Sequence, residues 1–494
     1  MAQAKIIQTA LDQLPYGSPE DRPQSKQRKL PLPEGVSRKQ MIRDVLIIAW
    51  PSLVELILTQ LTSMADQIMV GRLPGEAGIA ALSAVGLAAQ PKFLLMTMIM
   101  SLNVGATAVI ARYRGQQNQE KARQAFRQTV LLNLLVGLFF MCIGLAFAPQ
   151  LIRFMSGEGI SEQTLNLATE YLDIQMYGFL PLVMGFTITA ALRGIGDSKT
   201  PMVYNTVANV VNVIMNYALI YGKFGFPAMG VAGASWATVI GQTIASFMAI
   251  YVVFSGKNYI FFDFRKITQF DKSMLSNVIS IGFPAMVEQL FMRAGVIVFT
   301  RAVAGLGDTM YATHQICMSI QAFSFMMGQA FASSATTLMG QSLGKCRYDM
   351  AVNYMKQTRQ LGFYVSVLLG ILIIIFREPI VAIYNENPDV IHAGSSIMVV
   401  IALSQPIQAA QFIVSGGLRG AGDTKYTAFV ILITTLGVRS ILAVLLVNIL
   451  QWGLWGAWIA LMADQCLRSA LMIHRYNSCK WMEIWGQTRG AKKA

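Results

Sequence analysis

The sequence predicts an all-α membrane protein with about twelve transmembrane helices in two related six-helix lobes. Of its 494 residues, 54% are hydrophobic and only 13% are charged, which is about half the charge of a typical soluble chain. Many stretches of about 20 residues carry almost no charge, and that length crosses a bilayer as a helix. An eight-residue motif also occurs twice, once in each half of the chain. These observations indicate a duplicated membrane fold.

The apolar runs between charged or Gly/Pro-rich breaks define the expected helices in order. Their cores are residues 44–70, 83–110, 127–149, 168–190, 201–222, 230–254, 277–303, 312–340, 358–383, 395–416, 427–449 and 454–474. Residues 1–41 are polar, with Pro and mixed charge, and are expected to form a disordered cytosolic tail. The N-lobe then spans 42–256 and the C-lobe 273–478. The charged segment 257–272 is the cytosolic linker between them, and 479–494 is a basic cytosolic tail.

The duplication is carried by several motifs in the same order. The matched pairs are Pro51–Glu55 with Pro284–Glu288, Leu192–Lys199 with Leu418–Lys425, and Gly230–Ala234 with Gly453–Ala457. Six spans is an even number, so both lobes start on the same side of the membrane. We therefore expect a pseudo-two-fold axis along the membrane normal.

The Arg-Gly-X-Gly-Asp turns of the repeat are interpreted as architecture. Their glycines end one helix, and Asp197 or Asp423 is expected to cap the next. Arg193 and Arg419 are expected to face lipid headgroups or to pair with these aspartates.

The net charge of +14 is explained by where the basic residues lie relative to the expected spans. Most Lys and Arg residues fall in the tails and in alternate loops. Because such loops usually face the cytoplasm, we expect a protein of the inner membrane with both termini in the cytoplasm. Lys92, Arg293 and Arg439 lie within the expected spans. No nucleic-acid partner is expected. The five Cys residues show neither a disulfide framework nor metal-ligand spacing.

The first span carries a polar stripe of Glu55, Thr59, Thr62 and Asp66, spaced so that all four share one helix face. An ionisable side chain at membrane depth lines water, pairs, or binds an ion. In the alternative interpretation, Asp66 ends the span near the outer interface and Glu55 forms a structural salt bridge.

The fifth span repeats this spacing with amides at Asn205, Asn209, Asn212 and Asn216. Such amides either coordinate a cation through their carbonyl oxygens or act as hydrogen bonds between helices.

The second lobe is less acidic. Glu288 repeats Glu55, and Gln408 is a candidate cleft residue. In the alternative interpretation, Gln408 only bridges helices. Arg439 and Asp464 are expected to form a mutual or nearby ion pair.

The doubled Leu-Arg-Gly-X-Gly-Asp-[Ser/Thr]-Lys motif, the Pro-X-X-X-Glu openings and the Asp66–Gly71 segment together resemble the multidrug and toxic compound extrusion (MATE) family, prokaryotic type. The resemblance covers roughly residues 42–478. It implies a cation-coupling site at Asp66, Asn212 and Asn216, with Na⁺ as one candidate ion. The supporting polar cleft would contain Glu55, Thr59, Thr62, Asn209, Glu288 and Gln408.

The chain departs from the family in two places. Asn216 stands where archaeal-type members usually have Asp, and Gln408 stands near an acidic position of another branch.

The leading function is therefore a secondary antiporter that exports organic, cationic amphipathic solutes in exchange for H⁺ or Na⁺. No catalytic residue, metal centre or cofactor is expected, and the protein is expected to be a monomer in the lipid bilayer. A lipid-linked saccharide flippase is the alternative, although it would need more cations within the spans. An intramembrane enzyme and an ATP-driven pump are disfavoured, because the sequence has no catalytic constellation and no phosphate loop.

Overall fold

The computed structural model describes residues 36–73, 76–156, 161–256, 258–262, 271–306, 308–384 and 388–482. Most of the expected N-terminal tail, most of the linker 257–272 and most of the C-terminal tail lie outside these residues. The first helix, α2 (Arg38–Gly71), starts four residues before the expected lobe boundary. Its first turn is anchored, since Met41 is fully buried and Arg38 Nε donates to Gln357 Oε1 at 3.1 Å.

The chain divides into two compact units. The N unit comprises Val54–Ile110 and Gln119–Gly282, and the C unit comprises Met1–Leu53, Ala111–Asn118 and Phe283–Ala494. Helix α2 contributes to both units, as does α3 (Glu76–Gly115), and α9 (Lys272–Ala304) begins in the N unit and continues in the C unit.

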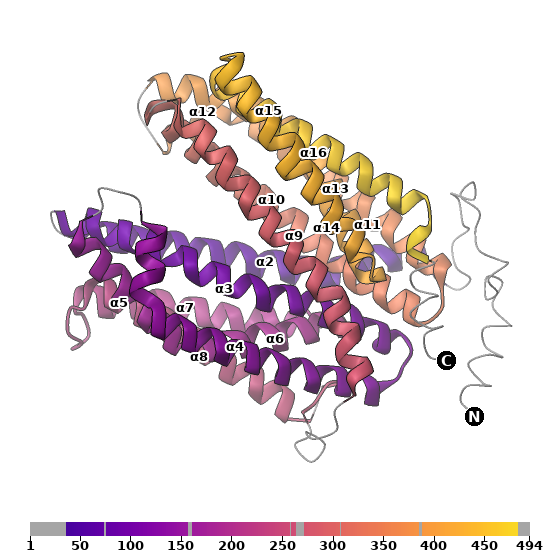
Figure 1. The fold of residues 1–494 in the computed structure, drawn as a ribbon. Helices are drawn as coiled ribbons and strands as arrows, with labels where there is room; N and C mark the ends of the chain where they lie inside the picture. The colour runs from indigo at the N-terminus through magenta and orange to yellow at the C-terminus, as the bar shows by residue number, and fades with distance from the viewer. Residues whose placement is uncertain are drawn as a thin grey trace, which may run out of the picture. The chain divides into compact units, whose positions relative to one another are not determined.

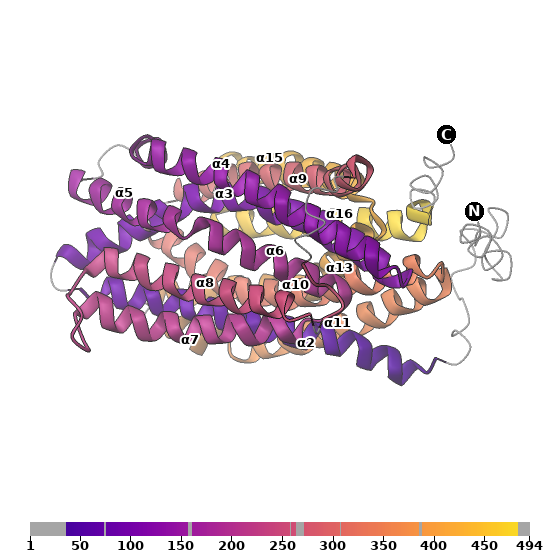
Figure 2. The same cartoon turned by 90° about the horizontal axis from the view of Figure 1, so that it is seen from below.

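The N unit is completed by α4 (Gln119–Met155), α5 (Glu162–Tyr177), α6 (Phe179–Ile195), α7 (Lys199–Tyr221) and α8 (Gly230–Phe254). Helix α6 lies between α4 and α8, and α7 packs along α8 (Figure 2). Helices α5 and α6 follow each other with a bend of 53° at Gly178, and together they are long and apolar enough to cross a membrane. A small core cluster of Val70, Ala81, Ile220, Val231 and Ala234 joins α2, α3, α7 and α8.

The C unit contains α10 (Asp308–Gly344), α11 (Tyr348–Ile375), α12 (Arg377–Ala382), α13 (Pro388–Ala421) and α16 (Gly453–Asn477). Helix α13 is central, because it packs against α10, α11 and α16 (Figure 1). Between α13 and α16 runs one continuous helical segment of α14 (Thr424–Ile431), η2 (Leu432–Arg439), α15 (Ser440–Val444) and η3 (Leu445–Ile449). Two of its four parts are π-helical, a rare geometry that often marks a functional site.

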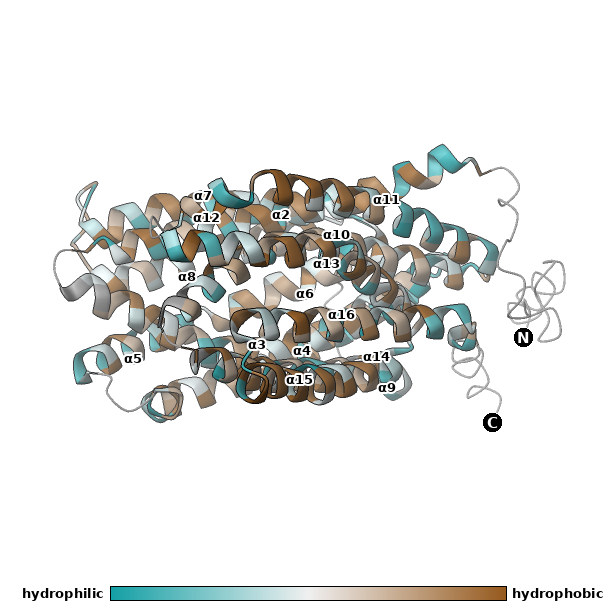
Figure 3. Cartoon of the chain, turned by 90° about the horizontal axis from the view of Figure 1, so that it is seen from above, coloured by the Kyte–Doolittle hydropathy of each residue, from teal (hydrophilic) through white to brown (hydrophobic). Residues whose placement is uncertain are grey.

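The helices match the expected spans in number and order, and no strand occurs in the described ranges. Among the described residues, nine helices are long and apolar enough to cross a membrane, or ten with the bent pair α5 and α6. Helices α10 and α16 stand at the positions of expected spans but fall outside that set. Hydrophobic residues cover the middle of most helices, and hydrophilic ones gather near several helix ends (Figure 3).

The repeated turn has the same backbone in both units. Gly196 and Gly422 adopt φ of 93° and 91°, a left-handed conformation that glycine takes without strain. The Asp197 N–H donates to Leu192 O at 2.9 Å, and the Asp423 N–H donates to Leu418 O at 2.8 Å. The expectation that glycine ends these helices is confirmed. Only Asp197 caps the following helix, where its Oδ1 accepts from the Thr200 N–H at 3.0 Å, because Asp423 is bound by Arg475 at 2.7 Å.

Candidate functional site

The N unit contains a partly open cavity of about 340 Å³. Side chains of α2, α6, α7 and α8 form most of its wall, with Met100 from α3. Its polar lining includes Glu55, Thr59, Thr62, Ser63, Asp66, Thr189, Arg193, Asn205, Asn209, Asn212, Thr238 and Gln242. Its apolar lining includes Leu56, Met100, Pro181, Leu182, Phe186, Ala208 and Ala245. The polar stripes expected on the first and fifth spans therefore face one common space.

Asp66 lies at one end of the stripe on α2 and is bound by amides of α7. Asn216 Nδ2 donates to Asp66 Oδ1 and also lies 3.1 Å from Asn212 Oδ1. An amide can be turned over within the same outline, and Asn212 turned over would place its nitrogen 3.0 Å from the same Asp66 oxygen. Asn212 can thus accept from Asn216 or donate to Asp66.

Asn216 is fully buried, and within the described residues its Oδ1 has no hydrogen-bond partner. A buried amide oxygen without a donor is unfavourable, and a cation that binds Asp66 would satisfy it. A carboxylate with neighbouring amide oxygens is the donor set that hard cations prefer. The three residues expected to form the coupling site are therefore brought together.

Glu55 lies at the other end of the α2 stripe and is held in an ion pair. Arg193 Nη2 donates to Glu55 Oε2 at 2.7 Å, and Asn205 Nδ2 donates to Oε1 at 2.8 Å. The expectation that Arg193 pairs with Asp197 or faces headgroups is wrong, because an arginine this close to a buried carboxylate compensates its charge. The alternative interpretation of Glu55 as a structural salt bridge agrees with this geometry.

Thr59 and Thr62 lie between the two carboxylates. Each hydroxyl donates to the carbonyl four residues earlier at 2.9 Å, so its lone pairs stay available to the cavity. Asn209 Nδ2 approaches Thr59 Oγ1 at 3.4 Å. These three residues form a polar track along the cavity wall.

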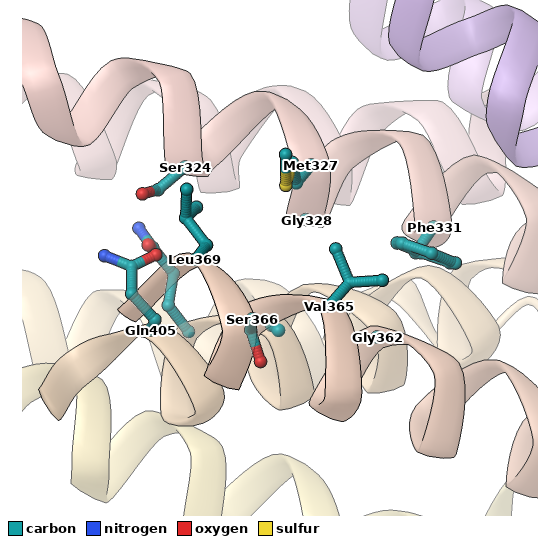
Figure 4. Close-up of a pocket in the computed structure, with 11 residues that line it drawn as sticks. Ser324, Met327, Gly328, Phe331, Gly362, Val365, Ser366, Leu369 and Gln405 are labelled. Carbon is teal, nitrogen blue, oxygen red and sulfur yellow. The ribbon is translucent and has the colours of Figure 1, made fainter. Parts of the chain in front are cut away.

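Glu288 and Gln408, the two candidates in the C unit, do not line this cavity. Glu288 has no side-chain exposure, pairs with Arg419 and accepts from Thr427 Oγ1 at 3.0 Å. Arg419 was expected to pair with Asp423 or to face lipid headgroups, and it pairs with Glu288 instead. Gln408 lines a space of about 10 Å³, the volume of about one water molecule. Figure 4 shows Ser324, Leu369 and Gln405 gathered at one end of that pocket.

Of the mutual or nearby ion pair expected for Arg439 and Asp464, the structure shows a nearby pair for Asp464 and no ion pair with a described residue for Arg439. Asp464 pairs with Arg468 at 2.6 Å within α16, and Arg468 also donates to Thr434 and Thr435. Arg439 instead lies over the ring of Phe299, with Cζ 4.2 Å from its centroid. The spacing of Asp464 and Arg468, four residues apart on a helix, is the signal that would have predicted this pair.

Lys92 is a residue for which the sequence predicts no role. It projects from α3 within the N unit, and its ammonium donates to Gln175 Oε1 of α5. The signal was a single basic residue inside an apolar span, which is uncommon unless it is paired or functional.

Comparison with known proteins identifies the family. The MatE family model matches residues 51–218 and 284–445, one match in each half of the chain. The chain is 30% identical over 445 residues to the "Probable multidrug resistance protein NorM" of Thermotoga maritima, covering 90% of this chain and 93% of that protein. A protein with the same description from Shewanella oneidensis is 28% identical over 407 residues, covering 82% and 86%.

A solved structure described as the outward-facing conformation of a multidrug resistance MATE family transporter matches with a TM-score of 0.81 at 20% identity, covering 93% of this chain and 100% of that one. The fold is therefore that of a known transporter architecture. Two family matches in tandem, and a relative of nearly the same length at 30% identity, show that the chain belongs to the MatE family of multidrug and toxic compound extrusion transporters.

Proposed function

We propose that the protein is a secondary antiporter that exports organic, cationic amphipathic solutes in exchange for H⁺ or Na⁺, with Asp66 as the coupling carboxylate. One observation carries this proposal. Asp66 lines the N-unit cavity together with Asn212, and Asn216 holds one of its oxygens. The other carboxylate in the cavity wall, Glu55, is already compensated by Arg193 at 2.7 Å.

The cavity suits an amphipathic organic cation. A volume of about 340 Å³ lies at the small end of the range for organic-ligand pockets. Leu56, Met100 and Phe186 supply apolar contact, and Met adapts to differently shaped solutes. A single uncompensated carboxylate at one end would fix the charged end of the solute.

Coupling would arise from competition for one carboxylate. A solute cation and the coupling ion both neutralise Asp66, so binding of one disfavours binding of the other. Loading of the ion would replace the Asn216 hydrogen bond or add to it, and this changes the contact between α2 and α7. Such a change biases the alternating-access equilibrium only if the two states bind the ion with different affinity.

The flippase alternative gains no support from the cavity. A pyrophosphate group requires several cations, whereas the cavity wall contains one arginine, Arg193, which pairs with Glu55.

The test is efflux of ethidium from proteoliposomes that contain purified protein, under an imposed pH gradient and, separately, an imposed Na⁺ gradient. We expect Asp66→Asn to lose gradient-driven efflux to the background of empty liposomes, because an amide neither titrates nor supplies a charge. The wild-type protein identifies the ion by the gradient to which it responds.

Folding is checked by monodisperse elution of Asp66→Asn in detergent. Ser63→Ala is the matched control, because Ser63 also lines the cavity but is neutral. Wild-type efflux by Asp66→Asn under both gradients would contradict the coupling assignment.

The location in the inner membrane with both termini cytoplasmic is likewise proposed, on the distribution of Lys and Arg. Labelling of an introduced cysteine at position 118 by an impermeant reagent from outside the cell would overturn that orientation.

A further inference from the structure

Lys92 is a partly buried cation on α3 in the N unit. Its ammonium donates to Gln175 Oε1, and in the described chain that is its one hydrogen-bond partner. Gln175 is itself held firmly, because its Nε2 donates to Ser235 O at 3.2 Å and to Ser235 Oγ at 3.0 Å. Ser235 Oγ donates to Tyr171 O at 2.9 Å. A rigid amide thus holds an ammonium that has no carboxylate in hydrogen-bonding contact.

The nearby carboxylate is Asp66. Val70, one turn after Asp66, packs in the same core cluster as Val85 of α3, Tyr171 of α5 and Ala234 of α8. The charges of Lys92 and Asp66 act on each other, although the structure contains no ion pair between them. Two opposite, partly buried charges therefore act on each other within the N unit, while the ammonium is bound to Gln175.

Several described groups lie around Asp66. Asn216 of α7 donates to it, Asn212 of α7 bonds Asn216 and Thr238 of α8, and the charges of Lys92 on α3 and of Asp66 act on each other. Arg193, the cation in the cavity wall, already pairs with Glu55, so the ammonium of Lys92 is a counter-charge that Asp66 can use when it carries no bound ion.

We propose that Lys92 is a tethered counter-cation that competes with the coupling ion for Asp66 and thereby sets the ion concentration at which the carrier loads. Gln175 is the positioning residue that holds the ammonium back from Asp66. This inference rests on the proposed coupling role of Asp66.

The proposal predicts shifts of opposite sign for two neighbouring substitutions. Lys92→Gln removes the competing charge, so the ion concentration that gives half-maximal efflux should fall about tenfold, as expected when one of two interacting charges inside a protein is removed. Gln175→Met keeps side-chain length but removes the acceptor. The ammonium then turns to Asp66, and the half-maximal ion concentration should rise several-fold. A general packing defect would not move the two values in opposite directions.

The experiment measures ethidium efflux from proteoliposomes against the concentration of whichever ion drives the wild-type protein. Lys92→Arg keeps the charge and should keep the wild-type ion concentration within about threefold, since charge dominates the effect. Reporter binding and monodisperse elution verify that each variant is folded.

The outcomes separate the two proposals. Opposite shifts, with Asp66→Asn inactive, support the role of Lys92. An unchanged half-maximal concentration in Lys92→Gln, or shifts of the same sign in both variants, overturns that role while an inactive Asp66→Asn still supports coupling at Asp66. Active Asp66→Asn removes the basis of both.

Discussion

Helix α2 of the N unit and helix α9 of the C unit have the same Pro-X-X-X-Glu opening, but they differ in the residue that follows the glutamate by eleven positions. In the N unit Asp66 follows Glu55 by eleven residues, and in the C unit Phe299 follows Glu288 by the same interval. Asn216 donates to Asp66, whereas Arg439 lies 4.2 Å over the ring of Phe299. One unit places a carboxylate with amides at this position, and the other places an arginine on an aromatic ring.

The features that both units share are structural. The Glu–Arg pair recurs as Glu55 with Arg193 and as Glu288 with Arg419. The left-handed glycine recurs at 196 and 422. The units differ in the polarity of the residue eleven positions after the glutamate, which is Asp66 in the N unit and Phe299 in the C unit. The duplication therefore preserved the parts that hold the helices together and left the membrane-depth position free to diverge.

The largest effect that would test this comparison concerns the repeated Glu–Arg pair. Glu288→Gln should lower the free energy of unfolding by about 3 kcal/mol, because it leaves Arg419 uncompensated beside a fully buried site. Glu55→Gln should lower it by about half as much. Its side chain is 9% exposed and that of Arg193 is 23% exposed, so the unpaired charge reaches water more easily. Thermal unfolding in detergent measures both.

The matched control is the double variant Glu288→Gln/Arg419→Met. Removal of both charges should recover part of the lost stability, since the penalty comes from the unpaired arginine. Equal loss in Glu55→Gln and Glu288→Gln would show that burial does not distinguish the two pairs.

Sequence reasoning was most reliable where one helix is considered alone. The spacing of Glu55, Thr59, Thr62 and Asp66 is fixed by the geometry of the helix, so their common face was predictable and the cavity confirms it. Partners across helices were not. Arg193 could have bound Asp197 four residues away, and only the packing of α6 against its neighbours brings it to Glu55. The location of Gln175 beside Lys92 depends on tertiary packing in the same way.

A smaller effect concerns the repeated glycines at the start of α8 and α16. A Cβ on Gly233 would lie 2.6 Å from Leu219 O, whereas one on Gly456 would lie 3.0 Å from Leu446 Cβ and O. Gly233→Ala should therefore cost about 2 kcal/mol, because the backbone of α7 must move. Gly456→Ala should be nearly neutral, since the milder contact is offset by the better helix propensity of Ala, about 1 kcal/mol. Unfolding midpoints compare the two, and a larger loss in Gly456→Ala would show that the α7–α8 contact is the looser one.

The smallest effect concerns Arg439. It is a basic residue within a span of the C unit, as Lys92 is a basic residue within a span of the N unit. Asp464, for which a mutual or nearby ion pair with Arg439 was expected, is bound by Arg468 at 2.6 Å. Arg439 packs on Phe299 instead. Arg439→Met keeps the length and the contact with the ring but removes the charge. The loss of a cation–π contact is worth about 1 kcal/mol, and the removal of a buried charge offsets part of it. We therefore expect a small loss in thermal stability.

The ion concentration for half-maximal efflux should stay within about twofold of wild type in Arg439→Met, because charge interactions weaken with distance and Phe299 carries no charge to titrate. Lys92→Gln, measured in the same liposomes, is the matched comparison, since both variants remove one cation from within a span. If Arg439→Met shifted this ion concentration as far as Lys92→Gln, ion coupling would not be confined to the N unit. The contrast between a carboxylate at position 66 and an aromatic ring at position 299 would then not separate the functions of the two units.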